Sequence, residues 1–173
     1  MAKPRPAAFL DRDGVINVDR GFVGRPSDFA LVTGAAAAIS LLNRNGYRVF
    51  VVTNQSGIGR GYYTEADFAE VTAHMNSVLA QQGAHVDDMR YCPFHPDAKI
   101  SRYRVDHHWR KPAPGMILDL FDHWDVDVNA SFLIGDSARD LEAANAAGIE
   151  GHLFTGGNLD HFLKTIKPDL DRS

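Results

Sequence analysis

The stretch AAFLDRDGVIN, residues 7–17, carries the strongest fold signal in the sequence, because a short apolar run ends there in two acids and a glycine. An apolar run of this length that stops at turn residues is typical of a buried β-strand. We therefore expect a strand over Ala7–Asp11, with Asp11 and Asp13 at or just beyond its carboxyl end.

The same pattern recurs along the chain. Four further runs predict strands, at Arg48–Thr53, Asp88–Cys92, Ser131–Ile134 and Glu150–Phe154. Segments typical of helices follow at Gly34–Asn45, Thr64–Gln82, Gly115–Trp124, Ala138–Ala147 and Asn158–Ile166. Apolar strands that alternate with helices predict a doubly wound α/β fold, with a parallel sheet covered on both faces. At this length we expect one domain over residues 1–173.

Local signals indicate where some of these helices begin and end. Thr64 and Asp67 have the spacing of a capping box, with Asp in place of the usual Glu. Gly46 stands where a helix commonly ends in a left-handed residue. The segment between them, Asn54–Tyr63, is rich in glycine and is expected to be a loop.

Composition and charge exclude several classes of protein. Hydrophobic residues make up 45 % of the 173 residues and charged residues 23 %, so a disordered chain or a fibre is excluded. A net charge of −4 without a basic block argues against nucleic-acid binding. Cys92 is the one cysteine, no apolar run approaches the roughly 18 residues of a membrane helix, and Met1–Pro6 carries no signal-peptide core. We expect a cytoplasmic monomer.

Acidic and phosphate-binding residue types gather at the predicted strand ends. In doubly wound folds, ligands bind outside the carboxyl ends of the strands. The residues expected there are Asp11, Asp13, Thr53, Asp136 and Asp140, with Lys111 just before a helix. Several carboxylates at one rim repel one another unless a cation lies among them, and oxygen ligands of this kind suit Mg²⁺. A hydroxyl and an ammonium group close by suit a phosphate.

Four blocks of the sequence together resemble the HAD (haloacid dehalogenase-like) superfamily of aspartyl-phosphate enzymes. They are FLDRDG at Phe9–Gly14, VVTNQSG at Val51–Gly57, RKP at Arg110–Pro112 and IGDSARD at Ile134–Asp140. Longer versions, LDRDGVIN, TNQSGIGRG, YCPFHP and RKPAPGM, are similar to the heptose-1,7-bisphosphate phosphatases and the histidinol-phosphate phosphatases. No cap-sized insertion follows Gly14, which fits this capless group.

The resemblance implies a role for each matching residue. Asp11 would be the nucleophile, and Asp13 would be the general acid and base. Asp11, Asp136 and the backbone carbonyl of Asp13 would hold Mg²⁺, with Asp140 in support. Thr53, Asn54 and Lys111 would bind the phosphoryl oxygens. The implied substrate is a small sugar phosphate, most specifically D-glycero-D-manno-heptose 1,7-bisphosphate at C7.

Arginine and amide residues beside these blocks are candidates for the rest of the substrate. Arg110 is suited to a bidentate contact with a second phosphate or with vicinal hydroxyls. Further candidates on the flanking loops are Asn17, Gln55, Ser56 and Arg60. Enzymes of the resembled group can carry Lys where this chain has Ser137, so we expect a less positive rim here.

The long segment Pro93–Pro112 commonly holds a structural Zn²⁺ in the resembled family. Two of the usual ligand positions are occupied by Phe94 and Trp109, which cannot bind zinc. One interpretation is that these two aromatic rings pack together and order the loop without a metal. The other is a rearranged zinc site built from Cys92, His95, His107 and His108.

Other functions stay open at this stage. The same chemistry would serve histidinol phosphate or another sugar phosphate. A protein that binds a phosphorylated metabolite without turnover would need a damaged catalytic set, and all four blocks are intact. Transfer of the phosphoryl group to a second sugar would need a cap to exclude water, so the missing insertion favours hydrolysis.

Overall fold

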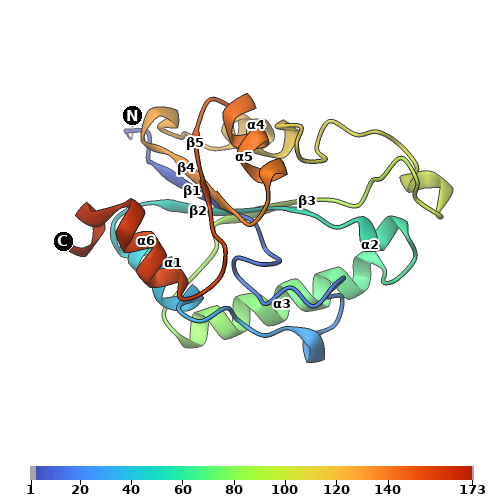
Figure 1. Cartoon of the computed structure of the whole chain (residues 1–173), viewed down its shortest axis with the longest axis horizontal. Helices are drawn as coiled ribbons and strands as arrows, with labels where there is room; N and C mark the ends of the chain where they lie inside the picture. Colours follow the sequence, from blue (N-terminus) through green and yellow to red (C-terminus); the bar gives the residue numbers. More distant parts are fainter. Residues whose placement is uncertain (1–2, 173) are drawn as a thin grey trace.

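The computed structural model describes residues 3–172, and its centre is a five-stranded sheet in which every pair is parallel. Met1 and Ala2 of the Met1–Pro6 stretch lie outside the described residues. The strand order is β3-β2-β1-β4-β5 (Figure 1). The strands are β1 (Ala7–Leu10), β2 (Arg48–Asn54), β3 (Asp88–Cys92), β4 (Phe132–Gly135) and β5 (Glu150–Leu153).

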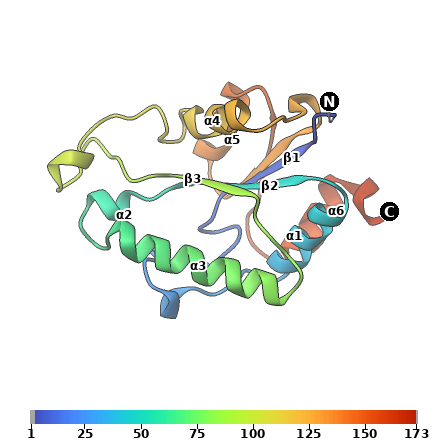
Figure 2. The same cartoon turned by 180° about the vertical axis from the view of Figure 1, so that it is seen from behind.

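Helices cover both faces of the sheet, as Figures 1 and 2 show from opposite sides. One face carries α1 (Ala35–Arg44), α3 (Glu65–Gln81) and α6 (Leu159–Ile166), and the other carries α4 (Gly115–His123) and α5 (Ala138–Ala146). The sixth helix, α2 (Ser56–Gly59), is a single turn after β2. The predicted doubly wound α/β class is confirmed.

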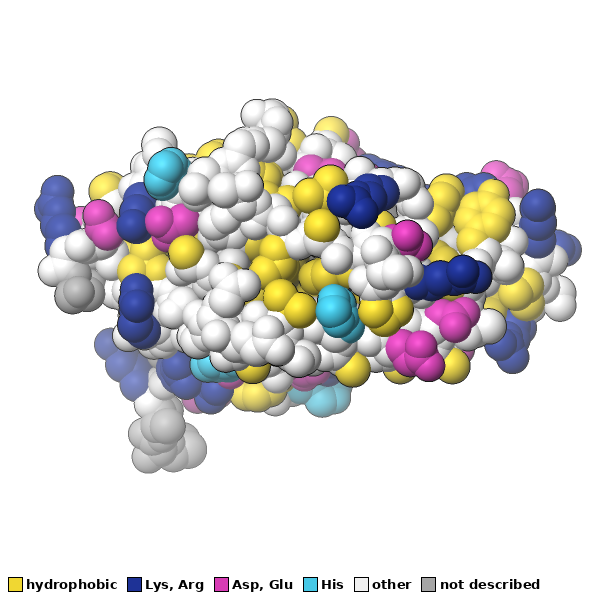
Figure 3. All heavy atoms as spheres, turned by 90° about the horizontal axis from the view of Figure 1, so that it is seen from below, with side chains coloured by type: hydrophobic (Ala, Val, Ile, Leu, Met, Phe, Trp, Pro, Cys, Tyr) yellow, Lys and Arg dark blue, Asp and Glu magenta, His cyan; other side chains and the backbone are white. Residues whose placement is uncertain are grey.

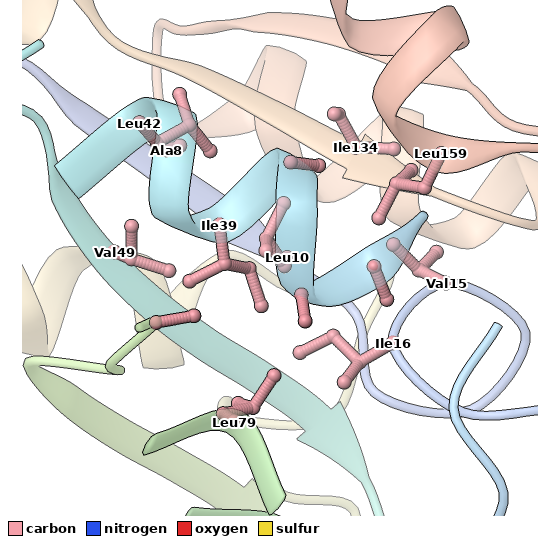
Figure 4. Close-up of a cluster of buried hydrophobic side chains, with 14 of the residues drawn as sticks. Ala8, Leu10, Val15, Ile16, Ile39, Leu42, Val49, Leu79, Ile134 and Leu159 are labelled. Atoms are coloured by element: carbon pink, nitrogen blue, oxygen red, sulfur yellow. The ribbon is translucent and has the colours of Figure 1, made fainter. Parts of the chain in front are cut away.

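The larger hydrophobic core lies between the sheet and α1, α3 and α6. Figure 4 shows Leu10, Ile39, Val49 and Ile134 pointing toward one another from β1, α1, β2 and β4. All four are at most 1 % exposed, and burying one such side chain is worth about 1.5–3 kcal/mol. A second cluster on the opposite face joins α4 and α5 to the same strands, so both faces hold the sheet rigid.

Two helix-end predictions are confirmed, and one segment differs. The Thr64 side chain accepts from the Asp67 backbone N–H, and Asp67 accepts in return from Thr64, which completes the capping box. Gly46 follows α1 with a φ of 80°, the left-handed value a helix end requires. Asn54–Tyr63 is not all loop, because Asn54 ends β2 and α2 follows. A four-residue turn with two glycines has no helical signal of its own.

The order of the strands fixes where a ligand can bind. The chain builds β1, β2 and β3 toward one edge and then crosses to β4 on the other side of β1. The carboxyl ends of β1 and β4 are therefore adjacent, with Leu10 opposite Ile134 and the Asp11 N–H donating to the Ile134 carbonyl at 3.1 Å. This is the switch point at which open α/β sheets bind ligands.

The face of the molecule shown in Figure 3 carries charges of both signs. Among residues 3–172, none of the helices has both the length and the apolar character needed to cross a membrane. Figure 3 shows one face on which Lys, Arg, Asp and Glu side chains of both signs surround scattered hydrophobic ones.

Candidate active site

A cleft of about 430 Å³ opens at the carboxyl ends of β1, β2 and β4. Its walls combine carboxylates, one lysine and several arginines, so the charge is divided between an acidic floor and a basic rim. The lining residues are Asp11, Asp13, Asp19, Gly21, Phe22, Asn54, Gln55, Ser56, Arg60, Tyr63, Arg110, Lys111, Asp136, Ser137, Arg139 and Asp140.

Three carboxylates form the floor of this cleft. Oxygen atoms of Asp11, Asp136 and Asp140 all lie within 4.8 Å of one another. Asp11 and Asp140 are buried, whereas Asp136 is exposed to the cleft. Gly14 makes this approach feasible, because a Cβ atom there would lie 2.1 Å from Asp136 Oδ2 and its φ of +85° is unfavourable for other residues.

Lys111 is the one lysine that lines the cleft, and it ties the floor together. Its side chain is 3 % exposed. Its Nζ donates to Asp140 Oδ1 at 2.6 Å and to the Val52 carbonyl at 2.8 Å, and it lies 3.1 Å from Asp11 Oδ1. Its backbone is fixed as well, because the Asn54 side chain both accepts from the Lys111 N–H and donates to the Lys111 carbonyl.

The carboxylates differ in how their charge is supported. Burial, with the charges of Asp140, Asp136 and Asp13 added to it, raises the pKa of Asp11 to about 8, although Lys111 acts in the opposite direction. Burial also raises the pKa of Asp136. Burial acts to raise the pKa of Asp140 too, but the Lys111 ammonium and the hydrogen bonds from Lys111 and Ser137 hold it below its usual range.

This pattern fits a divalent cation bound by Asp11 and Asp136. Asp140 has little capacity left, because its Oδ1 accepts from Lys111 while its Oδ2 accepts from Asp136 N–H, Ser137 N–H and Ser137 Oγ at 3.1 Å each. Asp11 and Asp136 keep unbonded oxygens, and their raised pKa values show that one lysine does not support a negative charge on both. A hard cation with oxygen ligands supplies what they lack.

Asp13 is held by three side chains at the edge of the floor. Its Oδ1 accepts from Arg12 Nη2 at 2.8 Å and from Asn17 Nδ2 at 2.9 Å, and its Oδ2 accepts from Gln55 Nε2 at 2.9 Å. Arg12 and Asn17 are both completely buried. Asn17, a sequence candidate for substrate contact, therefore lies behind the cleft and contacts Asp13 instead.

The candidates in and after β2 also divide into residues that line the cleft and one that lies behind it. Thr53 is 1 % exposed and does not line the cleft, and its hydroxyl accepts from Gln55 Nε2 at 2.9 Å. Asn54, Gln55 and Ser56 do line it. In this structure the Asn54 side chain faces the cleft, whereas the Thr53 hydroxyl is turned toward Gln55.

Three arginines form the basic rim. Arg60, Arg110 and Arg139 all line the cleft. Burial, together with the charges of Arg139 and Arg60, lowers the pKa of Arg110. Nη1 of Arg110 and Nε of Arg60 are buried and make no hydrogen bond to any part of the chain within residues 3–172. Two donors are thus held beside the cleft without an acceptor.

Several cleft residues were not among the sequence candidates. Arg139 supplies positive charge to the cleft two residues beyond Ser137. Phe22 lines the mouth with a φ of 53°, which is unusual for an aromatic residue, and packs edge-on against Tyr62. Neither residue has a sequence signal, because the place of Phe22 depends on the path of a loop and that of Arg139 on where α5 lies.

The long segment after β3 is ordered by aromatic stacking and hydrogen bonds. Phe94 stacks on His107 with ring centres 4.3 Å apart, and Trp109 meets the same imidazole edge-on at 6.0 Å. His107 therefore lies between the two rings that were expected to pack on each other. The Tyr103 hydroxyl adds a 2.6 Å bond to Glu65 on α3.

The structure does not gather the four residues of a rearranged zinc site. His95 and His107 each use Nδ1 to accept a backbone N–H, from Asp97 and Trp109, at 3.0 Å. His108 stacks on His107, and buried Cys92 has Sγ 3.9 Å from the Phe94 carbonyl. Within the described chain, the acids at positions 11, 136 and 140 are the only group of three or more such side chains with converging ligand atoms.

Comparison with known proteins matches this architecture. The HAD-hydrolase-like family model matches residues 108–170. The D-glycero-beta-D-manno-heptose-1,7-bisphosphate 7-phosphatase of Rhodopseudomonas palustris is 49 % identical over 172 residues, which cover 99 % of this chain and 96 % of that protein. The protein of the same name from Escherichia coli K12 is 44 % identical over 149 residues, covering 86 % of this chain and 78 % of that one.

A solved structure agrees with these relatives. The D,D-heptose 1,7-bisphosphate phosphatase of B. bronchiseptica, crystallised with magnesium and phosphate, superposes with a TM-score of 0.80 at 37 % identity, covering 92 % of this chain and 86 % of that one. The expected enzyme class, a HAD-type phosphatase, is confirmed. The chain belongs to the heptose-1,7-bisphosphate 7-phosphatase family of HAD-like hydrolases.

Proposed function

We propose that this protein is a Mg²⁺-dependent phosphatase that removes the C7 phosphate of D-glycero-D-manno-heptose 1,7-bisphosphate through a phosphorylated Asp11. The names of the relatives support the substrate class. The observation that carries the proposal is the division of one cleft into an acidic floor with Lys111 and a rim of three arginines. The floor can hold the phosphate that reacts, and the arginine rim can bind a second phosphate of the same substrate.

Asp11 is the proposed nucleophile. It follows the central strand β1 at the switch point, and Lys111 Nζ at 3.1 Å holds its Oδ1 and leaves Oδ2 for attack on phosphorus. Asp11, Asp136 and the backbone carbonyl of Asp13 are the proposed ligands of Mg²⁺, and Asp140 orients the backbone at Asp136. When bound, the cation neutralises charge on the phosphoryl oxygens and on Asp11.

Asp13 is the proposed acid and base. It lies two residues after Asp11 and lines the same cleft, so it can protonate the leaving sugar oxygen without competing for phosphorus. After the sugar leaves, the Asp13 carboxylate takes a proton from the water that cleaves the phosphorylated Asp11. The hydrogen bonds from Arg12, Asn17 and Gln55 keep it aimed through both steps.

Lys111 and the residues after β2 are the proposed binding groups for the reacting phosphate. Lys111 and Asn54 both line the cleft, and the Asn54 side chain is tied to the Lys111 backbone by two hydrogen bonds. Ser56 lines the cleft beside them. Thr53 takes the supporting role of fixing the Gln55 amide, because its hydroxyl is buried and bonded to it.

Arg60, Arg110 and Arg139 are the proposed binding groups for the second phosphate. Guanidinium groups bind phosphate through paired hydrogen bonds, and all three line the cleft, with Arg139 and Arg60 near enough for their charges to lower the pKa of Arg110. The buried donors on Arg110 and Arg60 that have no acceptor elsewhere in residues 3–172 support this assignment. Mutual repulsion of three cations is relieved when an anion binds between them.

A substrate panel tests the proposal. Phosphate release is measured with Mg²⁺ from the heptose 1,7-bisphosphate, the heptose 7-phosphate, the heptose 1-phosphate, histidinol phosphate and p-nitrophenyl phosphate. We expect the highest kcat/KM for the bisphosphate, with the C1 phosphate retained in the product by ³¹P NMR. A higher value for histidinol phosphate, or equal values for bisphosphate and monophosphates, would contradict the proposed substrate.

Binding of Mg²⁺ is expected to stabilise the protein more at higher pH. Between its ordinary pKa of 3.8 and the value of about 8 in the fold, Asp11 is protonated in the folded chain and ionised in the unfolded one. The folded state therefore holds the extra proton, and the stability of the cation-free protein falls as pH rises through this window. Mg²⁺ requires the ionised form, so its binding strengthens over the same range.

Thermal unfolding with and without Mg²⁺ measures this prediction. The increase in Tm on adding Mg²⁺ should be larger at about pH 8 than at about pH 6. Asp136→Asn should remove most of the increase, while Asp97→Asn, an exposed acid outside the cleft, should keep it. An increase that is equal at both pH values, or that survives in Asp136→Asn, would exclude this site for the cation.

The predicted monomeric state, the cytoplasmic location and the single domain over 1–173 stay predictions from the sequence.

A further inference from the structure

Tyr63 lies in a slot whose two walls are glycines. It is 7 % exposed and lines the cleft beside Gln55. A Cβ atom on either Gly24 or Gly57 would come within 2.4 Å of a Tyr63 ring atom. Gly24 belongs to the long segment after β1 and Gly57 to α2, so the ring is held between two separate stretches of backbone. The position of the Tyr63 hydroxyl is therefore fixed by the packing of its ring.

The Tyr63 hydroxyl determines how the Gln55 amide is oriented. It donates to Gln55 Oε1, while Gln55 Nε2 donates to Asp13 Oδ2 and to Thr53 Oγ1 at 2.9 Å each. An amide has one acceptor atom and two N–H donors, so this arrangement uses all of them. Burial raises the pKa of Tyr63, which keeps the proton on the hydroxyl.

The two carboxylate oxygens of Asp13 accept different numbers of hydrogen bonds. Oδ1 accepts from Arg12 and Asn17, both completely buried, through three N–H groups in all. Oδ2 accepts only from Gln55 within the described chain. Oδ2 is therefore the oxygen with a lone pair left for a molecule in the cleft, and Gln55 is the residue that sets its direction.

We propose that Tyr63 is a positioning residue for acid–base chemistry, which, by fixing the Gln55 amide, keeps Oδ2 of Asp13 free to exchange a proton with the substrate. This inference rests on the proposed role of Asp13. As the bond from phosphorus to the sugar oxygen breaks, that oxygen keeps the bonding electron pair and takes the proton from Oδ2, leaving Asp13 as a carboxylate. With the amide reversed, Gln55 Oε1 would accept this proton and hold it away from the substrate.

Tyr63→Phe tests the proposal, because it removes the hydroxyl and leaves the ring in its slot. We expect kcat/KM for the heptose bisphosphate to fall about tenfold, the effect of one buried hydrogen bond, with KM nearly unchanged. For p-nitrophenyl phosphate the change should stay within about twofold, because nitrophenolate leaves without a proton and kcat/KM reports only the steps through phosphoryl transfer. Tyr62→Phe is the matched control, since that ring is 54 % exposed.

Coupling to Gln55 gives a second readout. Gln55→Leu should produce the same selective loss, and adding Tyr63→Phe to it should cause no further loss, since Tyr63 acts through this amide. Additive losses, an equal loss on both substrates, or no loss in Tyr63→Phe would each overturn the inference.

Asp13→Asn on the same two substrates separates this inference from the function it rests on. If Asp13→Asn is no more harmful to the sugar substrate than to the nitrophenyl ester, the acid–base role of Asp13 fails and the inference fails with it. If Asp13→Asn is selective and Tyr63→Phe is not, the proposed function stands and only the role of Tyr63 is wrong.

Discussion

Asp11→Asn is expected to lower kcat for every phosphate ester by at least about 100-fold, because an amide oxygen cannot form the phosphorylated intermediate. The fold should survive. Burial and three neighbouring acids already favour the uncharged form of Asp11, whose pKa is raised to about 8, so a neutral amide of the same shape suits the place. Tm without Mg²⁺ should stay equal to that of the parent protein or rise.

Phosphate release and thermal unfolding of the same preparation measure both halves of this prediction. Asp19→Asn is the matched control, because it makes the same change in an exposed acid that lines the same cleft and should cost at most a few-fold. Retention of more than about a hundredth of the parental kcat would count against covalent catalysis through Asp11. A large fall in Tm would instead assign Asp11 a structural role.

The arrangement of the strands could be read from the sequence because it depends on burial. β1 and β2 are runs of apolar residues buried on both faces. A short run of this kind is typical of an inner strand of a parallel sheet, so the sequence predicts it well. Each predicted strand agrees with the structure to within about a residue at each end, the usual margin of helix and strand boundaries. The convergence of Asp11 and Asp136 then follows from the parallel order, which brings two strand ends together.

The direction of each side chain could not be read in the same way. Thr53 and Asn54 are neighbours in β2, and only the twist and register of the sheet decide which one faces the cleft. Asn17 has the same ambiguity in a loop, where it turned out to be buried against Asp13. Arg139 was overlooked because its charge counts only once α5 places it beside Arg110.

Arg110→Ala is expected to lower kcat/KM for the heptose bisphosphate by about 100-fold, mainly through KM, since a partly buried guanidinium–phosphate contact is lost. A p-nitrophenyl ester has nothing at that end of the cleft and should change by only a few-fold. The fold should tolerate the change, because Arg110 Nη1 makes no hydrogen bond within residues 3–172 that the alanine would break. Steady-state kinetics on the two substrates, with Tm as a check, measures this.

Lys111→Ala should behave differently from Arg110→Ala, although Arg110 and Lys111 are adjacent in the sequence. Lys111 Nζ contacts Asp11 and Asp140 on the floor, so its loss should damage both substrates alike and should also leave two buried acids without their cation. Arg110 faces the rim, so its loss should separate the two substrates. Equal losses on both substrates for Arg110→Ala would mean that Arg110 serves the reacting phosphate or the loop. The second-phosphate site would then rest on Arg60 and Arg139 alone, and the proposed preference for a bisphosphate would lose its main support.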